Sequence, residues 1–143
     1  DRCHAAVADG SALDRFRRVV AAQGGDSRVC DEPLAVLPKA ECVEPIRADQ
    51  SGFVGQLRAW PVGQASMLLG AGRTTAEGSI DPAAGIVLRK TVGDAVTAGE
   101  LLAELHFNLP HAEALPAAVA MFSQAVELVP EPTTRPPLIL ERL

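Results

Sequence analysis

Short apolar runs, each closed by glycine, proline or another turn-forming residue, fill the sequence from residue 41 onward. Runs of this length and punctuation are typical of β-strands. They cover residues 42–48, 53–60, 85–90, 101–107, 126–129 and, near the end, 138–140. Two helical patterns interrupt the runs, one that begins at Pro61 and one from His111 to about Gln124. Strands and helices do not alternate in the long units of a doubly wound sheet, so we expect an α+β domain with a compact, partly barrel-like sheet.

Prolines and turn residues refine these expectations. Pro45 confines the first run to a sheet edge, because proline cannot donate a ladder hydrogen bond. Pro61 suits the first turn of a helix, where the missing N–H costs nothing. Pro116 is unfavourable in a helix interior, so the last helix is expected to start nearer Leu115. Residues 92–100 carry turn signals and are expected to be a turn.

The first 40 residues have a different, helical character. Residues 1–8 are expected to end a helix and residues 11–23 to form another, with Ser11 as its N-cap and Asp14 in the capping-box position. An apolar stripe runs along this second helix through Leu13, Phe16, Val19 and Val20. Gly24 and Gly25 end the helix, and residues 26–40 form a connector with one short helical turn around Leu34.

Composition limits the function. The 143 residues are 48% hydrophobic with a net charge of −5, which argues against nucleic-acid binding. No apolar run is long enough to span a membrane, and the charged start is not followed by the apolar block of a signal peptide. The chain does not begin with Met, and its first residues look like the end of a helix, so we expect a piece of a longer protein.

Cysteine and histidine spacing argues against disulfides and metals. Three irregularly spaced cysteines do not form a disulfide framework and favour a reducing compartment such as the cytoplasm. No pair of cysteines and no histidine has the spacing of a zinc site. The residues considered are Cys3, Cys30, Cys42, His4, His106 and His111. We therefore expect no metal site and no cofactor.

The most unusual stretch runs from Leu69 to Thr75 and contains two glycines beside an arginine. It lacks the Gly-Lys-Ser/Thr ending of a P-loop, and it follows a helix, unlike a dinucleotide fingerprint, which opens one. One interpretation is a mobile loop whose arginine faces an anionic or polar ligand; the plainer one is a helix end and a surface turn. The candidate residues of this loop are Gly70, Gly72, Arg73 and Thr74.

Two further patterns are candidates for a functional site. Residues 85–105 combine strand, turn, turn and strand in the manner of biotinyl and lipoyl carrier domains. Residues 104–108 stand where a carrier domain has its lysine, but they contain no lysine. Lys90 lies at the end of the earlier strand. A carrier or interaction module is therefore the alternative function. His106, His111 and Glu113 are candidate acid–base groups, and nucleophilic catalysis would also need an activated Ser or Cys, such as Cys42, Ser66 or Ser79. No spacing joins them, so we assign no catalytic residue.

Several segments together resemble the pyrimidine-nucleoside and thymidine phosphorylase family, in the family's order and over nearly the whole chain. They are GSALDRFRRVVAAQGGD (10–26), LPKA (37–40), ADQSGFVGQL (48–57), MLLGAGRTT (67–75), IDPAAGIVLRKTVGDAVTAGELLAEL (80–105) and PLILE (137–141). The resemblance implies that residues 1–34 end an all-helical domain and that residues 35–143 are the carboxy-terminal part of an α/β domain with a barrel-sandwich or hammerhead shape.

The same resemblance implies an activity. Such enzymes convert a pyrimidine nucleoside and phosphate into the free base and a pentose 1-phosphate, in a cleft that closes between two domains. The family's phosphate- and base-binding motifs are absent here, so most catalytic residues are expected elsewhere in the same enzyme chain, and both uridine and thymidine stay open as substrates. The resemblance also implies a homodimer formed through the helical domain, and it places the 70–78 loop near the cleft, where the loop is expected to help closure.

Overall fold

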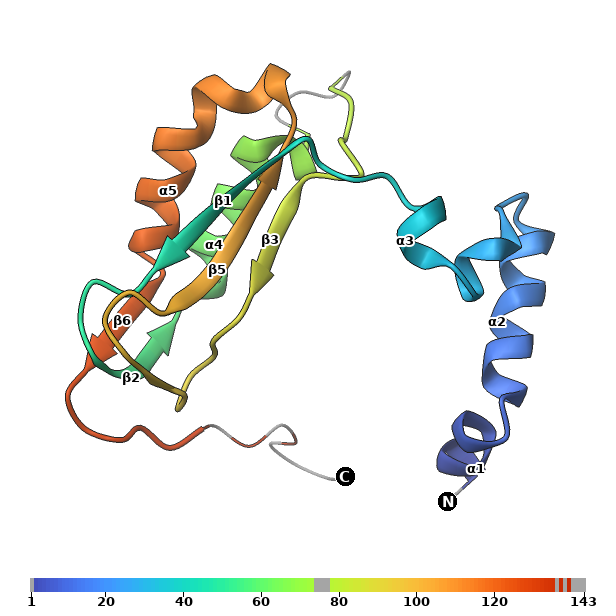
Figure 1. The fold of residues 1–143 in the computed structure, drawn as a ribbon, viewed down its shortest axis with the longest axis horizontal. Coiled ribbons are helices and arrows are strands. Elements are labelled where there is room, and N and C mark those ends of the chain that lie inside the picture. The colour runs from blue at the N-terminus through green and yellow to red at the C-terminus, as the bar shows by residue number, and fades with distance from the viewer. Residues whose placement is uncertain (1, 74–77, 136, 138, 140–143) are drawn as a thin grey trace. The chain divides into compact units, whose positions relative to one another are not determined.

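The structure is a computed structural model that describes residues 2–73, 78–135, 137 and 139. Figure 1 traces the path of the chain. Two compact units can be distinguished, residues 1–39 and residues 40–143. The second unit is a mixed α+β structure, which confirms the predicted class.

The first unit contains only helices and turns in its described part. Its elements are α1 (Arg2–Ala8), α2 (Ser11–Ala22), a 3-10 turn (Ser27–Cys30) and α3 (Pro33–Val36). Arg17 on α2 binds both carboxylate oxygens of Asp31, at 2.6 and 3.0 Å, and so ties the helix to the segment that follows it.

The predicted capping box of α2 is wrong. The N-cap is Gly10, in a left-handed conformation, and Ser11 is already helical. The Ser11 N–H donates instead to Oδ1 of Asp9 at 2.9 Å, which lowers the pKa of the Asp9 carboxyl. The Asp9–Gly10 turn therefore supplies the cap that the sequence pattern assigned to Ser11 and Asp14.

The second unit is built from two three-stranded antiparallel sheets. The first has the strand order β1-β5-β3 and the second the order β4-β2-β6. The strands are β1 (Cys42–Arg47), β2 (Gly52–Leu57), β3 (Gly85–Leu88), β4 (Ala95–Val96), β5 (Leu101–Phe107) and β6 (Val126–Val129). β1 lies at a sheet edge, as Pro45 predicted.

Two helices cover one face of the β1-β5-β3 sheet (Figure 1). They are α4 (Ala59–Ser66), which continues into a π-helical turn (Met67–Ala71), and α5 (Leu115–Ser123), which follows a 3-10 turn (Leu109–Ala114). Pro116 lies in the first turn of α5, so the late start predicted for this helix is confirmed.

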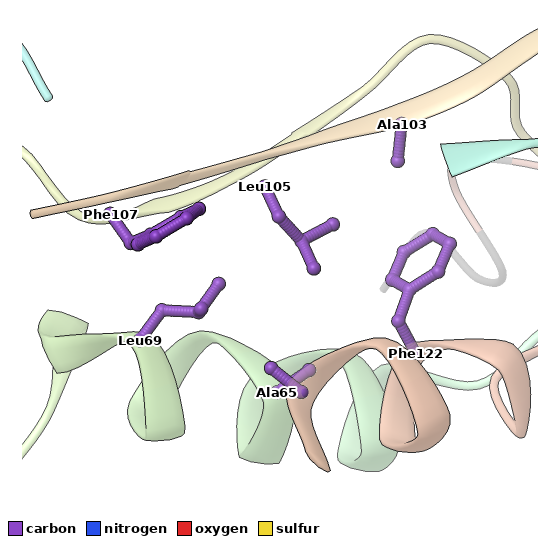
Figure 2. Packing of buried hydrophobic residues seen from close by; sticks show 7 residues of the cluster. Ala65, Leu69, Ala103, Leu105, Phe107 and Phe122 are labelled. Carbon is purple, nitrogen blue, oxygen red and sulfur yellow. The ribbon is translucent and has the colours of Figure 1, made fainter. Parts of the chain in front are cut away.

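The main core lies between β5 and these helices. Figure 2 shows three side chains of β5 directed toward the helices, opposite residues of α4, of its π-helical turn and of α5. They are Ala103, Leu105 and Phe107, facing Ala65, Leu69 and Phe122. Leu105 and Phe122 are almost fully buried, and each contributes about 1.5–3 kcal/mol by its removal from water.

A second, smaller core forms at the other sheet from Ala48, Val54, Val96 and Leu102. Leu102 precedes Ala103 on β5, and successive strand residues point to opposite faces. The central strand β5 therefore serves both cores.

Two strand predictions need correction. Trp60 was placed in a strand, but β2 ends at Leu57 and Trp60 lies in α4 with 69% of its surface exposed. The reason is that the first turn of a helix tolerates Pro61, so the helix begins two residues before it. Ala95 and Val96, predicted as part of a turn, form β4 because Phe53 and Gly52 pair with them. The run predicted at 138–140 falls largely outside the described residues.

Candidate functional site

The glycine pair of the candidate loop packs against the chain's own side chains. Gly70 lies in the π-helical turn with a φ of 104°, a conformation that favours glycine. A β-carbon placed on Gly70 would lie 2.6 Å from Nε2 of His111, and one on Gly72 would lie 2.9 Å from Cγ of Met67. The space that a side chain would need at these two glycines is therefore taken by His111 and Met67.

Arg73 follows this turn and has an exposed side chain. Five ion pairs are formed between described residues, and Arg73 takes part in none of them. Thr74 lies outside the described residues. The contribution of this loop to a ligand site stays a prediction.

Asp81 is hydrogen-bonded to Gly70, the first of the two glycines of the candidate loop. Its N–H donates to the carbonyl oxygen of Gly70 at 2.9 Å. Its carboxylate accepts from the N–H of Ala83 at 2.9 Å and from Nδ2 of Asn108 at 2.7 Å. These donors, with a smaller contribution from His111, hold the pKa of Asp81 below its ordinary value, so Asp81 is a carboxylate at neutral pH.

Asn108 occupies the junction between Asp81 and β1. Its Oδ1 accepts from the N–H of Glu41 at 2.8 Å, and the Glu41 carboxylate accepts from the N–H of Leu109 at 3.2 Å. The carbonyl oxygen of Asn108 accepts from the N–H of His111 at 2.9 Å. The group of Glu41, Gly70, Asp81, Asn108 and His111 is called the junction cluster below.

Sequence reasoning missed most of the junction cluster. Asp81 precedes Pro82, and Asp-Pro is a turn-initiating pair, which was a usable signal for its turn. Glu41 and Asn108 are 67 residues apart, and nothing local in the sequence relates them.

No side-chain hydrogen bond between described residues joins the candidate acid–base groups, although His111 and Glu113 lie in the same 3-10 turn. His106 lies on β5, where its Nε2 is buried without a hydrogen-bond partner among the described residues. Cys42 packs on the main core, whereas its neighbour Val43 is the residue paired with His106. Because alternate strand residues face opposite sides, Cys42 and His106 lie on opposite faces of the sheet. This excludes a Cys42–His106 nucleophile pair.

The carrier-domain alternative finds no support in the geometry. Residues 104–107, in the place of the carrier lysine, are part of the central strand β5 and form no exposed hairpin tip. The Lys90 ammonium pairs with Glu100 at 2.5 Å and donates to the Ala95 carbonyl oxygen at 3.0 Å. The Lys90 hydrogen bond is the main reason that the pKa of Glu100 is lowered. The Lys90 ammonium is therefore bound to two groups of the second unit.

The described part of the second unit includes two hollows among others. One of about 360 Å³ is lined by residues of β1, β5, β6 and α5, with Arg47, Asp49 and Gln50 at its polar side. The other, of about 390 Å³, is a mostly apolar groove between α4 and β3. Neither is lined by residues of the candidate loop or by the junction cluster.

Within the described ranges, no three His, Cys, Asp or Glu side chains are grouped as metal ligands would be. None of the helices in the described part combines the length and apolarity of a membrane span.

Comparison with known proteins identifies the class of this fold. Residues 53–128 match the family model of the pyrimidine nucleoside phosphorylase C-terminal domain. This range contains four of the five residues of the junction cluster, all but Glu41.

Full-length relatives agree with that match. The chain is 50% identical over 103 residues to the pyrimidine-nucleoside phosphorylase of Geobacillus stearothermophilus, covering 72% of this chain and 24% of the relative. It is 42% identical over 129 residues to the protein of the same name from Staphylococcus haemolyticus, and this match covers 90% of this chain and 29% of the relative. The chain belongs to the pyrimidine-nucleoside phosphorylase family, so the resemblance inferred from the sequence is confirmed. It spans about a quarter of the length of these curated relatives.

Proposed function

We propose that this chain is the carboxy-terminal part of an enzyme that phosphorolyses pyrimidine nucleosides. The proposal rests on one observation, the extended identity to proteins named pyrimidine-nucleoside phosphorylase. In the reaction a phosphate oxygen attacks the anomeric carbon of the pentose, and the bond from that carbon to the pyrimidine nitrogen breaks. The products are the pentose 1-phosphate and the free base, which takes up a proton.

The chain contributes scaffold and one wall of the cleft. No side-chain hydrogen bond or ion pair between described residues joins the acid–base candidates His106, His111 and Glu113, which supports catalytic residues in the remainder of the same polypeptide. Arg73 is exposed and takes part in none of the ion pairs between described residues. Its guanidinium suits phosphate or the sugar phosphate product, because its planar fork matches phosphate oxygens. The proposal assigns Gly70, Gly72 and Thr74 to the same loop of the substrate cleft as Arg73.

The domain assignment follows from the same family. Residues 1–34 are taken as the last helices of an all-helical domain, and residues 35–143 as part of an α/β domain. The all-helical content of the first unit supports the former. The strand–turn–strand run from β3 to β5 supports a hammerhead-like arrangement in the latter.

A homodimer formed through the helical domain belongs to the proposal as well. α2 exposes Leu13, Phe16 and Val19, an apolar stripe suited to cover by further helices. The enzyme is placed in the cytoplasm, and the thiols of Cys30 and Cys42, which form no disulfide, are in keeping with a reducing compartment.

A phosphorolysis assay tests the function. The longer protein that contains this chain is incubated with thymidine or uridine and phosphate, and free base and pentose 1-phosphate are quantified by chromatography. Both products are expected, with neither formed when phosphate is omitted. The isolated 143-residue chain is the matched control and is expected to be inactive. An inactive longer protein would refute the function, and turnover by the isolated chain would refute the placement of the catalytic residues.

A further inference from the structure

The amide of Asn108 joins two parts of the second unit that are distant in sequence. On one side its Oδ1 accepts from the Glu41 N–H, and on the other its Nδ2 donates to Oδ2 of Asp81. Both bonds are short, 2.8 and 2.7 Å. The side chain thus uses an acceptor and a donor at once, which no carboxylate, ammonium or apolar side chain can do at neutral pH.

The Asp81 side of this bridge leads to the candidate loop. Asp81 is bonded through its N–H to the Gly70 carbonyl oxygen. Gly70 is fixed in turn by its left-handed conformation and by the His111 ring against its α-carbon. Arg73 lies three residues beyond Gly70, so the start of its segment is fixed by the junction cluster.

The Glu41 side of the bridge leads to the connector. The boundary between the compact units falls between Lys39 and Ala40, so Glu41 is the second residue of the second unit. A second bond, from the Leu109 N–H to the Glu41 carboxylate, holds the same point. Asn108 and Leu109 therefore fix the chain at Glu41, where it leaves the connector.

We propose that Asn108 is a positioning residue that couples Glu41, just after the connector, to the hydrogen-bonded pair of Gly70 and Asp81, and so holds Arg73 in its working position. This inference rests on the proposed function for its catalytic consequence, because the family reaction takes place in a cleft between domains. Asn108 itself does not touch the reactants.

Exchanging the two bonded side chains provides the test. Asn108→Asp keeps the acceptor for the Glu41 N–H but sets a carboxylate against that of Asp81. The double variant Asn108→Asp with Asp81→Asn restores one donor and one acceptor, and the summed charge of the pair is that of the wild type. Gln124→Leu, which removes an exposed amide at the end of α5, is the control.

Two readouts are taken on the longer protein that contains this chain. The first is the rate of tryptic cleavage after Arg73, and the second is kcat and KM for phosphorolysis. Asn108→Asp is expected to speed cleavage and to lower kcat about tenfold or more, since small misplacements of substrate-positioning groups cost that much. The exchanged pair is expected to return both quantities to within about twofold of the wild type, the coupling expected of residues in contact.

The outcomes separate the inference from the function. If Asn108→Asp changes neither readout, or if the exchanged pair fails to recover a loss, the inference is wrong. If Asn108→Asp does not fold, the test depends on the double variant Asn108→Asp with Asp81→Asn. A folded double variant with wild-type cleavage supports the bridge, and an unfolded double variant contradicts it. A wild-type protein without phosphorolysis would refute the proposed function, while the cleavage rates would still decide the coupling.

Discussion

The imidazole ring of His111 lies against the α-carbon of Gly70, so close that a β-carbon there would be 2.6 Å from Nε2. The contact joins the 3-10 turn before α5 to the end of the π-helical turn after α4. Two separate constraints therefore act on position 70, the positive φ of the backbone and the space taken by the ring.

Gly70→Ala is expected to destabilise the protein by about 2–5 kcal/mol, the sum of a left-handed backbone cost and an overpacking cost. Urea unfolding measures the change. Gly63→Ala is the matched control, because Gly63 lies inside α4 with open space around it, and it is expected to stabilise by about 0.5–1 kcal/mol.

Adding His111→Ala to Gly70→Ala separates the two constraints. Removal of the ring relieves the crowding but leaves the backbone cost, so the double variant is expected to show a coupling of about 1 kcal/mol or more in a double-mutant cycle. Strict additivity of the two single changes would show that the ring does not crowd position 70.

The central strand supplies a second stability prediction. Leu105→Ala leaves a cavity between β5 and the two helices, and we expect a loss of about 2–5 kcal/mol in the free energy of unfolding. Val87→Ala on the neighbouring strand β3 removes a partly exposed side chain of the same sheet and is expected to cost less than about 1 kcal/mol. Equal losses would mean that the core is not where Figure 2 places it.

The pH dependence of stability isolates Asp81. Its pKa in the folded state is lowered, first by the Ala83 N–H and then by Asn108 and His111. A group with a lowered folded pKa stabilises above its unfolded pKa, about 3.9, and this contribution is lost as the pH falls through the folded value. The difference in unfolding free energy between wild type and Asp81→Asn is therefore expected to be constant above about pH 5 and to shrink below about pH 4.

Asn108→Leu provides the control for that profile. It removes one of the donors to Asp81, so the pH-dependent part of the difference should become smaller. The effect of Asp81→Asn is measured against pH in the wild-type background and in the Asn108→Leu background. The same pH dependence in both backgrounds would contradict the role of the Asn108–Asp81 bond in lowering the pKa of Asp81.

Arg73→Ala tests the candidate loop directly. We expect kcat/KM for phosphorolysis to fall about tenfold or more, equivalent to about 1.4 kcal/mol, with partial recovery in Arg73→Lys, which keeps the charge but loses the planar fork. The melting temperature should not change, because the side chain is exposed and takes part in none of the described ion pairs. Arg15→Ala, another exposed arginine, is the control, and unchanged kinetics in Arg73→Ala would remove Arg73 from the site.

Local pattern was sufficient for much of the fold. The strands predicted at 101–107 and 126–129 are β5 and β6 without change, because turn residues bound them and their apolar content is that of a buried strand. The late start of α5 followed from the geometry of proline alone. The N-cap of α2 was mispredicted because two adjacent residues, Gly10 and Ser11, are both of a type that suits an N-cap, and Gly10 occupies the position while Asp9 accepts from the Ser11 N–H.

The sequence by itself determined the family, the α+β class and the position of most strands and helices, since these depend on residue types and short-range spacing. Only the tertiary structure decided that Ala95–Val96 forms a strand, that Cys42 and His106 lie on opposite faces, and that Asn108 joins Glu41 to Asp81. These relationships depend on which strands are paired and in which register. Pairing brings together residues that are tens of positions apart, and no local preference encodes it.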